Sequence, residues 1–384
     1  MHPILKTTKE LEEYLKKLNE SKVIFLDTEF KRQDTYFPIL CLIQISVNGS
    51  VALIDPLIKE CKLDPLVQVL LDDNIVKVLH SARQDLEIFY LYTKGKAILP
   101  IFDTQIAAAF CGYGQAVSYE NLVSDLLSVV LDKSQRITDW EKRPLTDRQI
   151  KYAINDVLYL PQIYNALQQK LAQNNSADYF LEELATIEDN SFVQVAIEKL
   201  VSKIKFESRD PNKVARMVKL ISWREELAGK LNLNRAKIIT DEEIFLLVFQ
   251  FSSQTILEKQ DAIVISELSR ILQAPLQDSE LALAKKIIAK KFNKSIKLNK
   301  SFCRLILDLV SQEMKIASSI IATSDDINLL VQHDINNAHF AQNRIMKGWR
   351  YLVFGQKLEE FFSGRIIVRI EQGNVRLVPF VAMS

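Results

Sequence analysis

The chain has 384 residues, more than one hydrophobic core usually supports, so two or three domains are expected. Hydrophobic residues make up 48% and charged residues 25%, and 9 Gly and 10 Pro are too few for a low-complexity chain. The formal net charge is +1, and no apolar run approaches the roughly 20 residues of a membrane span, so a membrane protein is excluded.

The first 160 residues alternate between short apolar runs and helical patterns. We predict helices over 7–20, 63–71 and 81–92, and strands over Val23–Leu26, Ile39–Val47, Val51–Ile54, Ile75–Leu79 and Ile98–Phe102. Asn48-Gly49 indicates a hairpin turn, and Asp103-Thr104 can cap a further helix. A meander of three antiparallel strands, followed by strands separated by helices, resembles the order of a ribonuclease-H-like α/β domain, which has a mixed sheet with flanking helices.

Beyond Pro161 the pattern is helical almost to the end, with polar stretches at 173–176 and 189–190 as candidate linkers. A β-rich tail is predicted over Ile366–Val381. We therefore expect an α/β domain over 1–170, a helical linker over 171–204, and all-helical domains over 205–288 and 289–384.

Positive charge gathers in the helical part. Residues 1–170 hold 20 basic and 22 acidic side chains, whereas Lys199–Lys237 holds 11 basic and 4 acidic, and Lys285–Arg304 holds 8 basic and none acidic. Two basic stretches behind a slightly acidic domain indicate a polyanionic partner, although a solvated helix face would explain either stretch alone.

Cysteine and histidine spacing argues against zinc. Four cysteines lie far apart with no Cys-x-x-Cys pair, at Cys41, Cys61, Cys111 and Cys303. We expect free thiols in a reducing cytoplasm, and the N-terminus lacks the apolar region of a secretory signal. Any metal site is expected to consist of carboxylates, which favour Mg²⁺ or Mn²⁺.

Asp27 and Glu29 stand at the end of the first predicted strand. Strand geometry places residues two apart on the same face of a sheet. Adjacent carboxylates repel each other and raise each other's pKa unless a cation lies between them. The pair is a candidate metal site, and a solvent-facing strand end is the alternative.

Two further carboxylates follow later elements. Asp85 lies in the first turns of the helix after the strand at Ile75–Leu79, and His80 before it is more typical of a structural hydrogen bond than of a ligand. Tyr152 and Asp156 are four apart on a predicted helix and therefore face the same way.

Together these motifs resemble those of the DEDD exonuclease superfamily, in the branch that carries tyrosine at the position of Tyr152. The stretch from about residue 20 to 170 resembles ribonuclease D through His80–Tyr90, Asp103–Gln105, Val117–Leu122, Asp132–Arg136, Thr138–Trp140 and Arg143–Leu145. Trp223–Ala228 followed by Ile238–Glu243 resembles the helicase-and-RNase-D C-terminal (HRDC) module, with Asn234-Arg235 where that module often has Pro-Arg. A divergent second HRDC-like domain is expected over 289–384.

The resemblance implies a 3′→5′ exoribonuclease that uses two divalent cations, Mg²⁺ or Mn²⁺, and releases nucleoside 5′-monophosphates. Asp27 would bridge both cations, while Glu29 and Asp156 would hold the one that activates water. Asp85 would serve the other cation. Tyr152 would position the water without ionising, because a phenol with a pKa of about 10 is a poor base at neutral pH.

A basic loop with an aromatic residue directly precedes the helix of Tyr152. We predict that Lys133, Arg136, Trp140 and Arg143 contact the 3′ end of the substrate, through phosphate contacts and base stacking. The alternative is that Trp140 belongs to the core and that the charges are solvated.

The resemblance implies RNA as the partner, in particular transfer-RNA precursors with 3′ extensions, and we expect a cytoplasmic monomer. Truncation at about residue 200 is expected to preserve activity on short oligonucleotides and to abolish it on structured RNA. A DNA exonuclease and a non-catalytic RNA-binding protein with this fold are the alternatives. The presence of all four carboxylates argues against the second, and no phosphate-binding Gly-rich motif is present.

Overall fold

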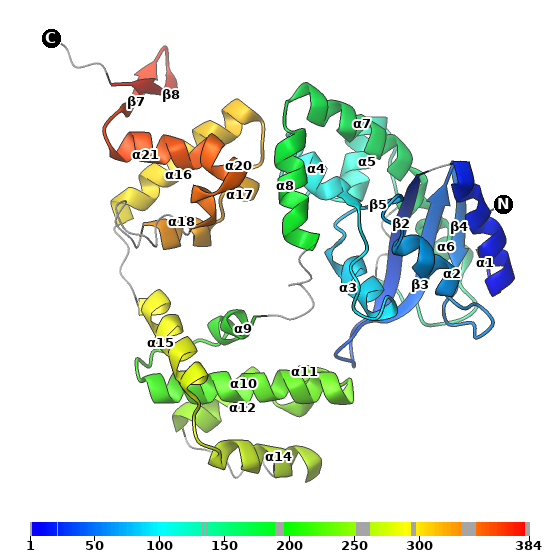
Figure 1. Ribbon diagram of the computed structural model, residues 1–384, viewed down its shortest axis with the longest axis horizontal. Coiled ribbons are helices and arrows are strands. Elements are labelled where there is room, and N and C mark those ends of the chain that lie inside the picture. Colours follow the sequence, from blue (N-terminus) through cyan, green and yellow to red (C-terminus); the bar gives the residue numbers. More distant parts are fainter. Residues whose placement is uncertain are drawn as a thin grey trace. The chain divides into compact units, whose positions relative to one another are not determined.

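The structure is a computed structural model that describes residues 2–20, 22–132, 134–135, 137–188, 196–250, 262–292, 297–331 and 343–380. Its contacts group the chain into two compact units, whose elements are labelled in Figure 1. The first unit comprises residues 1–29, 41–189 and 294–384, and the second comprises 30–40 and 190–293. The four-part division expected from the sequence stays a prediction.

A six-stranded sheet forms the centre of the first unit, in the order β1-β4-β3-β2-β5-β6. Its strands are β1 (Ile4–Leu5), β2 (Val23–Lys31), β3 (Ile39–Val47), β4 (Ser50–Ile54), β5 (Val76–Leu79) and β6 (Ile101–Asp103). β3 and β4 pair antiparallel, whereas β1 with β4, β2 with β5 and β5 with β6 pair parallel. The predicted mixed sheet is therefore confirmed.

The turn between β3 and β4 follows from its two residues. Asn48 and Gly49 have φ angles of 49° and 73°, as a type I′ hairpin turn requires, and Val47 pairs with Ser50. The predicted hairpin is confirmed.

Two ends of the sheet differ from the prediction. β1 was not predicted, because two residues carry no strand pattern and Ile4–Leu5 becomes a strand only by pairing with Leu53 and Ile54. β6 begins at Ile101 and not at Ile98, because Pro100 has no N–H to donate to a neighbouring strand.

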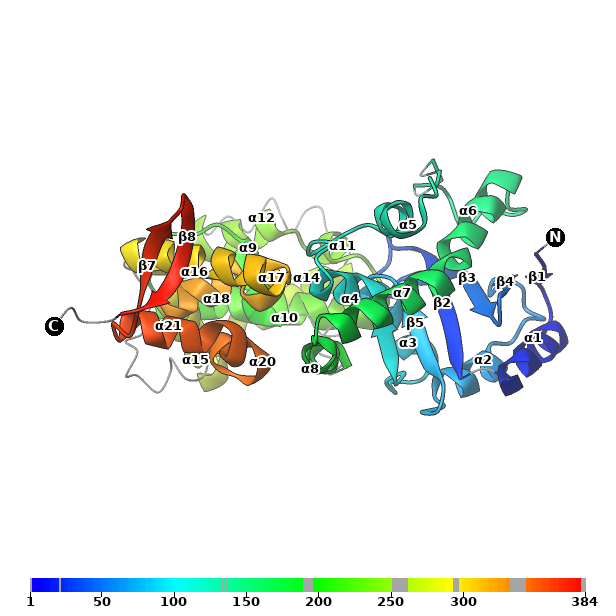
Figure 2. The same ribbon diagram turned by 90° about the horizontal axis from the view of Figure 1, so that it is seen from above.

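Helices cover both faces of this sheet. They are α1 (Thr8–Leu15), the 3₁₀ helix η1 (Lys16–Glu20), α2 (Asp64–Leu70), α3 (Arg83–Tyr92), α4 (Thr104–Phe110), α5 (Tyr119–Leu127), α6 (Asp147–Leu158), α7 (Leu160–Gln173) and α8 (Ala177–Glu188). Helices α1 and α2 lie on one side of the sheet and α5 and α6 on the other (Figure 2). Asp103 accepts hydrogen bonds from the N–H groups of Gln105 and Ile106, so its predicted capping of α4 is confirmed.

The end of the chain also belongs to the first unit. It contains α16 (Lys297–Met314), α17 (Ser318–Ile321), α18 (Ser324–Leu330), η3 (Arg344–Met346), α20 (Gly348–Arg350), η4 (Tyr351–Gly355) and α21 (Gln356–Phe362). It closes with a hairpin of β7 (Ile366–Glu371) and β8 (Asn374–Pro379), which confirms the predicted β-rich tail.

Trp349 joins this C-terminal segment to the helices beside the sheet. Its buried ring lies 5.1 Å from that of Phe110 and is stacked on Tyr179 at 5.7 Å. The backbone N–H of Trp349 donates to the carboxylate of Glu182, and Arg350 pairs with Glu183. The contacts bury large aromatic surface, so the segment packs as part of the same core.

The second unit is helical. It contains α9 (Ile197–Lys203), α10 (Pro211–Leu231), α11 (Arg235–Ile238), α12 (Asp241–Phe245), the π-helical turn η2 (Leu246–Gln250), α14 (Ala262–Gln273) and α15 (Asp278–Phe292). Its apolar core surrounds α10, which buries residues from Val214 to Ala228. The helical C-terminal region is confirmed, and its HRDC character stays a prediction.

Residues 30–40, which run from the end of β2 to the start of β3, pack against α10 and α11 in this second unit. Tyr36 donates through its hydroxyl to Glu225, and Arg235 lies over the Tyr36 ring at 5.2 Å. Asn234 caps α11 and donates to the carbonyl of Gln33. The Asn-Arg pair therefore forms a regular helix start in place of the Pro-Arg of the module it resembles.

Within the part of the chain that the structure describes, no helix is both long enough and apolar enough to cross a membrane.

Candidate active site

Three of the predicted carboxylates converge. Asp27 and Glu29 point from β2 to the same face of the sheet, and α6 brings Asp156 to them. Each of the three offers an oxygen, and these oxygens all lie within 4.8 Å of one another. Residues 127 positions apart in the chain thus form one cluster, because α6 packs across the sheet.

Asp85 joins this group from the first turn of α3. Its side chain is buried, and the hydroxyl of Thr28 on β2 donates a hydrogen bond to it. Thr28 lies between Asp27 and Glu29 and faces the other side of the strand. Thr28 thus fixes Asp85 close to Asp27 and Glu29, whose pKa values the charge of Asp85 raises.

Burial and mutual repulsion make the cluster electrostatically unfavourable without a cation. Burial, followed by the charges of Asp27 and Asp85, raises the pKa of Glu29 to about 9. Burial and the neighbouring carboxylates also raise the pKa values of Asp27 and Asp156 well above their ordinary range. Burial raises the pKa of Asp85 to about 7, against the lowering effect of the Thr28 hydrogen bond.

The cluster suits a hard divalent cation. All its donors are carboxylate oxygens, which Mg²⁺ and Mn²⁺ prefer. The Oδ2 atom of Asp156 is buried and has no hydrogen-bond partner among the described residues. A buried carboxylate oxygen without a donor is costly, and a cation between the three carboxylates would satisfy it.

Tyr152 lies one turn before Asp156 on α6. Burial, followed by the charges of Asp156 and Glu29, raises the pKa of its phenol, so the hydroxyl keeps its proton throughout the physiological range. Its ring packs against the ring of Trp140 with centroids 6.0 Å apart. Tyr152 can therefore donate a hydrogen bond beside the carboxylates, and Trp140 restricts where its ring can lie.

Trp140 is only 4% exposed, so the predicted stacking on a substrate base is wrong for this structure. A base needs an open ring face, and here packing with Tyr152 and the surrounding core covers the indole. The alternative reading, that Trp140 belongs to the core, is the one the structure supports.

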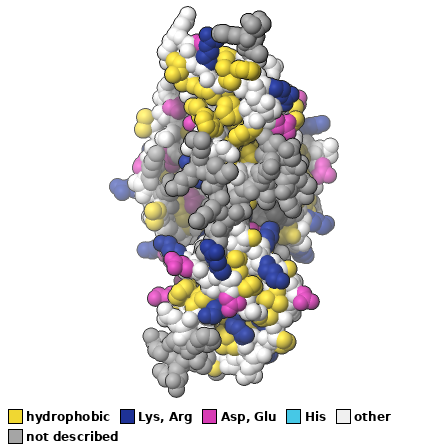
Figure 3. Space-filling view, turned by 90° about the vertical axis from the view of Figure 1, so that its left-hand side faces the viewer, with side chains coloured by type: hydrophobic (Ala, Val, Ile, Leu, Met, Phe, Trp, Pro, Cys, Tyr) yellow, Lys and Arg dark blue, Asp and Glu magenta, His cyan; other side chains and the backbone are white. Residues whose placement is uncertain are grey.

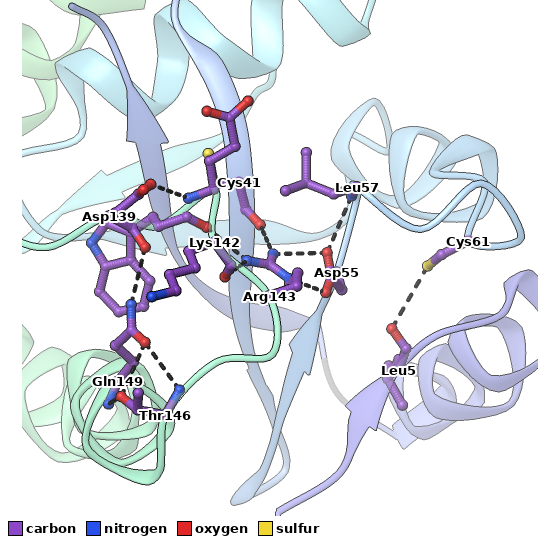
Figure 4. Close-up of polar contacts among 12 residues, drawn as sticks. Leu5, Cys41, Asp55, Leu57, Cys61, Asp139, Lys142, Arg143, Thr146 and Gln149 are labelled. Atoms are coloured by element: carbon purple, nitrogen blue, oxygen red, sulfur yellow. Dashed lines mark hydrogen bonds and ion pairs between the residues drawn. The ribbon is translucent and has the colours of Figure 1, made fainter.

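The predicted phosphate contact of Arg143 is also wrong. Its Nε and Nη2 atoms donate to Asp55 at 2.6 and 2.8 Å, and Nη2 also donates to the Cys41 carbonyl at 2.6 Å (Figure 4). Nη1 donates to the carbonyls of Trp140 and Lys142 at 2.7 and 3.0 Å. All five N–H donors of a guanidinium are thus used within the protein.

Arg143 instead fastens the loop before α6 to the ends of β3 and β4. Gln149, in the first turn of α6, holds the same loop from the other side by donating to the Asp139 carbonyl at 3.2 Å (Figure 4). The loop that carries Trp140 is therefore tied at both ends. The other two predicted substrate residues, Lys133 and Arg136, lie outside the described residues.

Several supporting residues were missed from the sequence. Asp55 and Thr28 act over 88 and 57 positions of chain, where no local pattern signals them. His80 was expected to be structural, and this is confirmed, because its ring nitrogens bond to Thr104 Oγ1 and the Val117 carbonyl at 2.9 and 3.1 Å.

Comparison with known proteins agrees with this arrangement. Residues 3–172 match the family described as 3′-5′ exonuclease. A protein named ribonuclease D from Bartonella henselae is 32% identical over 98% of this chain and 93% of its own length, and one from Sphingobium indicum is 33% identical over 98% of both. The chain belongs to the ribonuclease D family. The crystal structure of Escherichia coli RNase D superposes with a TM-score of 0.73 at 28% identity, covering 94% of this chain and 99% of that one.

As a ribonuclease D, the protein is a hydrolytic 3′→5′ exoribonuclease. It acts on RNA and, like other exonucleases of its superfamily, depends on divalent metal. The carboxylate cluster on β2 and α6 is where this chain offers ligands for such a metal.

Proposed function

We propose that Asp27, Glu29, Asp85 and Asp156 hold two divalent cations, Mg²⁺ or Mn²⁺, for removal of nucleoside 5′-monophosphates from RNA 3′ ends. The observation that carries the proposal is the convergence of three carboxylates within 4.8 Å, one of them with a buried oxygen that has no partner among the described residues. Asp27, Glu29 and Asp156 would share one cation, and Asp85 would contribute to the second.

When bound, the cations would offset the carboxylate charges, lower the pKa of water and stabilise charge on the attacking and leaving oxygens. The chain's own residues orient the reactants. Thr28 holds Asp85 by a hydrogen bond, close enough to Asp27 and Glu29 for its charge to raise their pKa values. Tyr152 keeps its proton on Oη and can donate it in a hydrogen bond to the attacking water, which fixes the direction of attack.

We further propose transfer-RNA precursors with 3′ extensions as substrates of a cytoplasmic monomer. Family membership and the basic stretches at Lys199–Lys237 and Lys285–Arg304 support an RNA that contacts the helical part of the chain. The four cysteines are free thiols in the structure, which is compatible with a reducing compartment.

The test is digestion of a 5′-labelled single-stranded RNA with Mg²⁺, with Mn²⁺ and with chelator. We expect a ladder that shortens from the 3′ end, requires metal and is absent in Asp27→Ala. A matched control is Asp55→Asn, which alters a buried carboxylate outside the cluster and should keep the metal dependence. Metal-independent cleavage would contradict the proposal, and RNA binding without cleavage under any metal would favour the non-catalytic alternative.

Sugar specificity needs a second comparison. An RNA and a DNA oligonucleotide of the same sequence and length should differ in turnover, with RNA degraded faster. Equal or faster degradation of DNA would instead indicate the DNA exonuclease alternative, because the carboxylates alone do not distinguish a 2′-hydroxyl. A transfer-RNA precursor with a 3′ extension should be trimmed to a defined end.

A further inference from the structure

The hairpin of β7 and β8 carries a pair of arginines that directly face each other. The strands join at a two-residue turn, Gln372-Gly373, whose φ angles are 50° and 78°. The register pairs Arg369 with Arg376, and Ile370 with Val375. Like charges on directly opposite residues of an antiparallel pair destabilise it, so the folding of this hairpin does not explain the pair.

Both arginines lie on one face of the hairpin. Because side chains alternate along a strand, Val368 and Leu377 share one face, and both are half-buried. The hairpin contacts α16 through β8 and α21 through β7. Arg369 and Arg376 are exposed on the opposite face, which they share with Ile367 and Val378. The side chain of Arg369 is 64% exposed. The arginine pair is therefore exposed on a hairpin that contacts α16 and α21.

The hairpin is positively charged. Residues 365–380 contain three arginines and one acidic residue, Glu371, which gives 3 − 1 = +2. Glu371 lies 3.6 Å from Arg369. Arg376 has no ion pair among the described residues. One carboxylate thus offsets part of the repulsion, and a net positive face remains.

We propose that this arginine face is an RNA-contacting element in which Arg369 and Arg376 bind phosphates of the substrate backbone. The inference rests on the exoribonuclease activity, which makes a polyanion the substrate. An arginine fork binds phosphate oxygens in bidentate geometry, and a phosphate between the two side chains removes their repulsion. Such contacts hold RNA without reading its sequence.

Exposed apolar side chains at the hairpin tip favour a protein partner as the alternative to RNA. Ile370 is 73% exposed and Val375 37% exposed, on the face opposite to the arginines. Figure 3 shows hydrophobic and basic side chains close together on the upper part of the molecule. A protein partner would use the apolar tip, whereas RNA requires the arginines, so separate substitutions distinguish the two occupants.

The experiment compares the full-length wild type with Arg369→Ala/Arg376→Ala on two probes. One is a stem-loop RNA of transfer-RNA size with a single-stranded 3′ tail, and the other is a five-nucleotide RNA. Binding is measured in chelator over a range of salt concentrations, and turnover is measured with Mg²⁺. Lys9→Ala/Lys16→Ala, which removes the same charge from around α1, is the matched control.

For the double arginine variant, we expect affinity for the stem-loop RNA to fall roughly ten-fold. Its slope of log affinity against log salt should decrease by about one per arginine. Turnover of the five-nucleotide RNA should be unchanged. Arg369→Lys/Arg376→Lys, which keeps the charges but loses the bidentate geometry, should recover only part of the affinity, and the lysine control should bind like wild type.

Three results would overturn the proposal. The first is an arginine variant that binds the stem-loop RNA as tightly as the wild type, while the wild type shortens the five-nucleotide RNA. The second is an equal loss of affinity for the stem-loop RNA in the lysine control. The third is a change of oligomeric state in Ile370→Ser with no effect of the arginine variant, which would assign the hairpin to protein docking. A wild type inactive on the five-nucleotide RNA would contradict the proposed catalytic function instead, while the binding comparison would still test the hairpin.

Discussion

The hydroxyl of Tyr152 is the group whose removal should most cleanly separate chemistry from binding. Tyr152→Phe deletes one oxygen and keeps the ring packed against Trp140. If the hydroxyl orients the attacking water, kcat should fall about a hundred-fold while KM for a short RNA stays unchanged, because the interaction matters only in the transition state. Single-turnover rates and KM on a five-nucleotide RNA provide the measurement.

Trp140 supplies the matched control for that variant. Trp140→Phe keeps an aromatic neighbour for Tyr152 and should retain most of the activity. Trp140→Ala removes a buried ring and should lower the free energy of unfolding by about 3–5 kcal/mol, with a fall in kcat at temperatures where the variant is still folded. A Tyr152→Phe variant as active as wild type would remove Tyr152 from the mechanism.

The raised carboxylate pKa values make the effect of metal on stability depend on pH. Glu29 has a folded pKa of about 9, against an ordinary value of 4.5. In chelator, its contribution to stability is therefore fully present below about pH 4.5 and is lost as pH rises toward about 9. A bound cation favours the ionised form, so the rise in Tm caused by Mn²⁺ should be larger at about pH 8.5 than at about pH 6.

Thermal unfolding with Mn²⁺ and with chelator at both pH values measures this difference. Asp27→Asn/Glu29→Gln should melt higher than wild type in chelator at the upper pH, because it lacks the repelling charges, and should gain little from Mn²⁺. A metal-induced rise in Tm that is the same at both pH values, or persists in the variant, would show that the cation binds elsewhere.

The parts of the site that could be predicted were those with a local pattern. Asp27 and Glu29 show the spacing of one strand face, and Tyr152 and Asp156 that of one helix face. The loop before α6 has no such pattern, since its basic residues look the same whether they bind phosphate or protein. Only the fold shows that Arg143 meets Asp55, 88 positions away, and that Trp140 is covered.

Among the elements, the short helix α20 depends on the glycine at its start. Gly348 has φ +52°, and a Cβ there would lie 1.7 Å from the carboxylate oxygen of Glu182. That carboxylate accepts a hydrogen bond from the backbone N–H of Trp349, so moving the carboxylate aside breaks this hydrogen bond. Gly348→Ala should therefore lower the free energy of unfolding by about 2–4 kcal/mol, as backbone strain plus a lost buried hydrogen bond.

Gly364→Ala is the control, because Gly364 also has positive φ, +73°, but has open space around the Cβ position. It should cost about 1–2 kcal/mol from backbone strain alone. Urea unfolding of both variants gives the difference. Equal losses would mean that Glu182 relaxes freely and that its bond to the Trp349 N–H contributes little.

The sequence predicted strands with a long apolar pattern correctly, and it missed the strand that forms only by pairing with another strand. β3 has nine residues, seven of them apolar, and was placed correctly, as was the hairpin turn at Asn48-Gly49. β1 has two residues and forms only through β4. The sequence carries no signal that residues 30–40 belong to the helical unit, because their membership depends on contacts with Glu225 and Asn234, which are about 190 to 200 positions away.

For the whole molecule, the C-terminal segment changes what truncation should do. A chain ending near residue 200 was expected from the sequence to keep activity on short oligonucleotides and to lose it on structured RNA. In the structure, residues 294–384 pack with the sheet-containing part in one unit, and Trp349 covers Phe110 and Tyr179. Removing this segment exposes apolar and aromatic surface, so the shortened chain should be markedly less stable.

A chain ending at residue 189 should therefore have a lower midpoint in urea than the full chain, and its activity on a five-nucleotide RNA should fail at a lower temperature. Trp349→Ala in the full chain should shift the midpoint in the same direction by part of that amount, because it removes the central ring and leaves the rest of the segment in place. The carboxylates are intact in both, so activity at low temperature should be close to wild type. If the truncated chain unfolds at the midpoint of the full chain, the segment is an independent domain and its contacts with α4 and α8 contribute nothing to the catalytic fold.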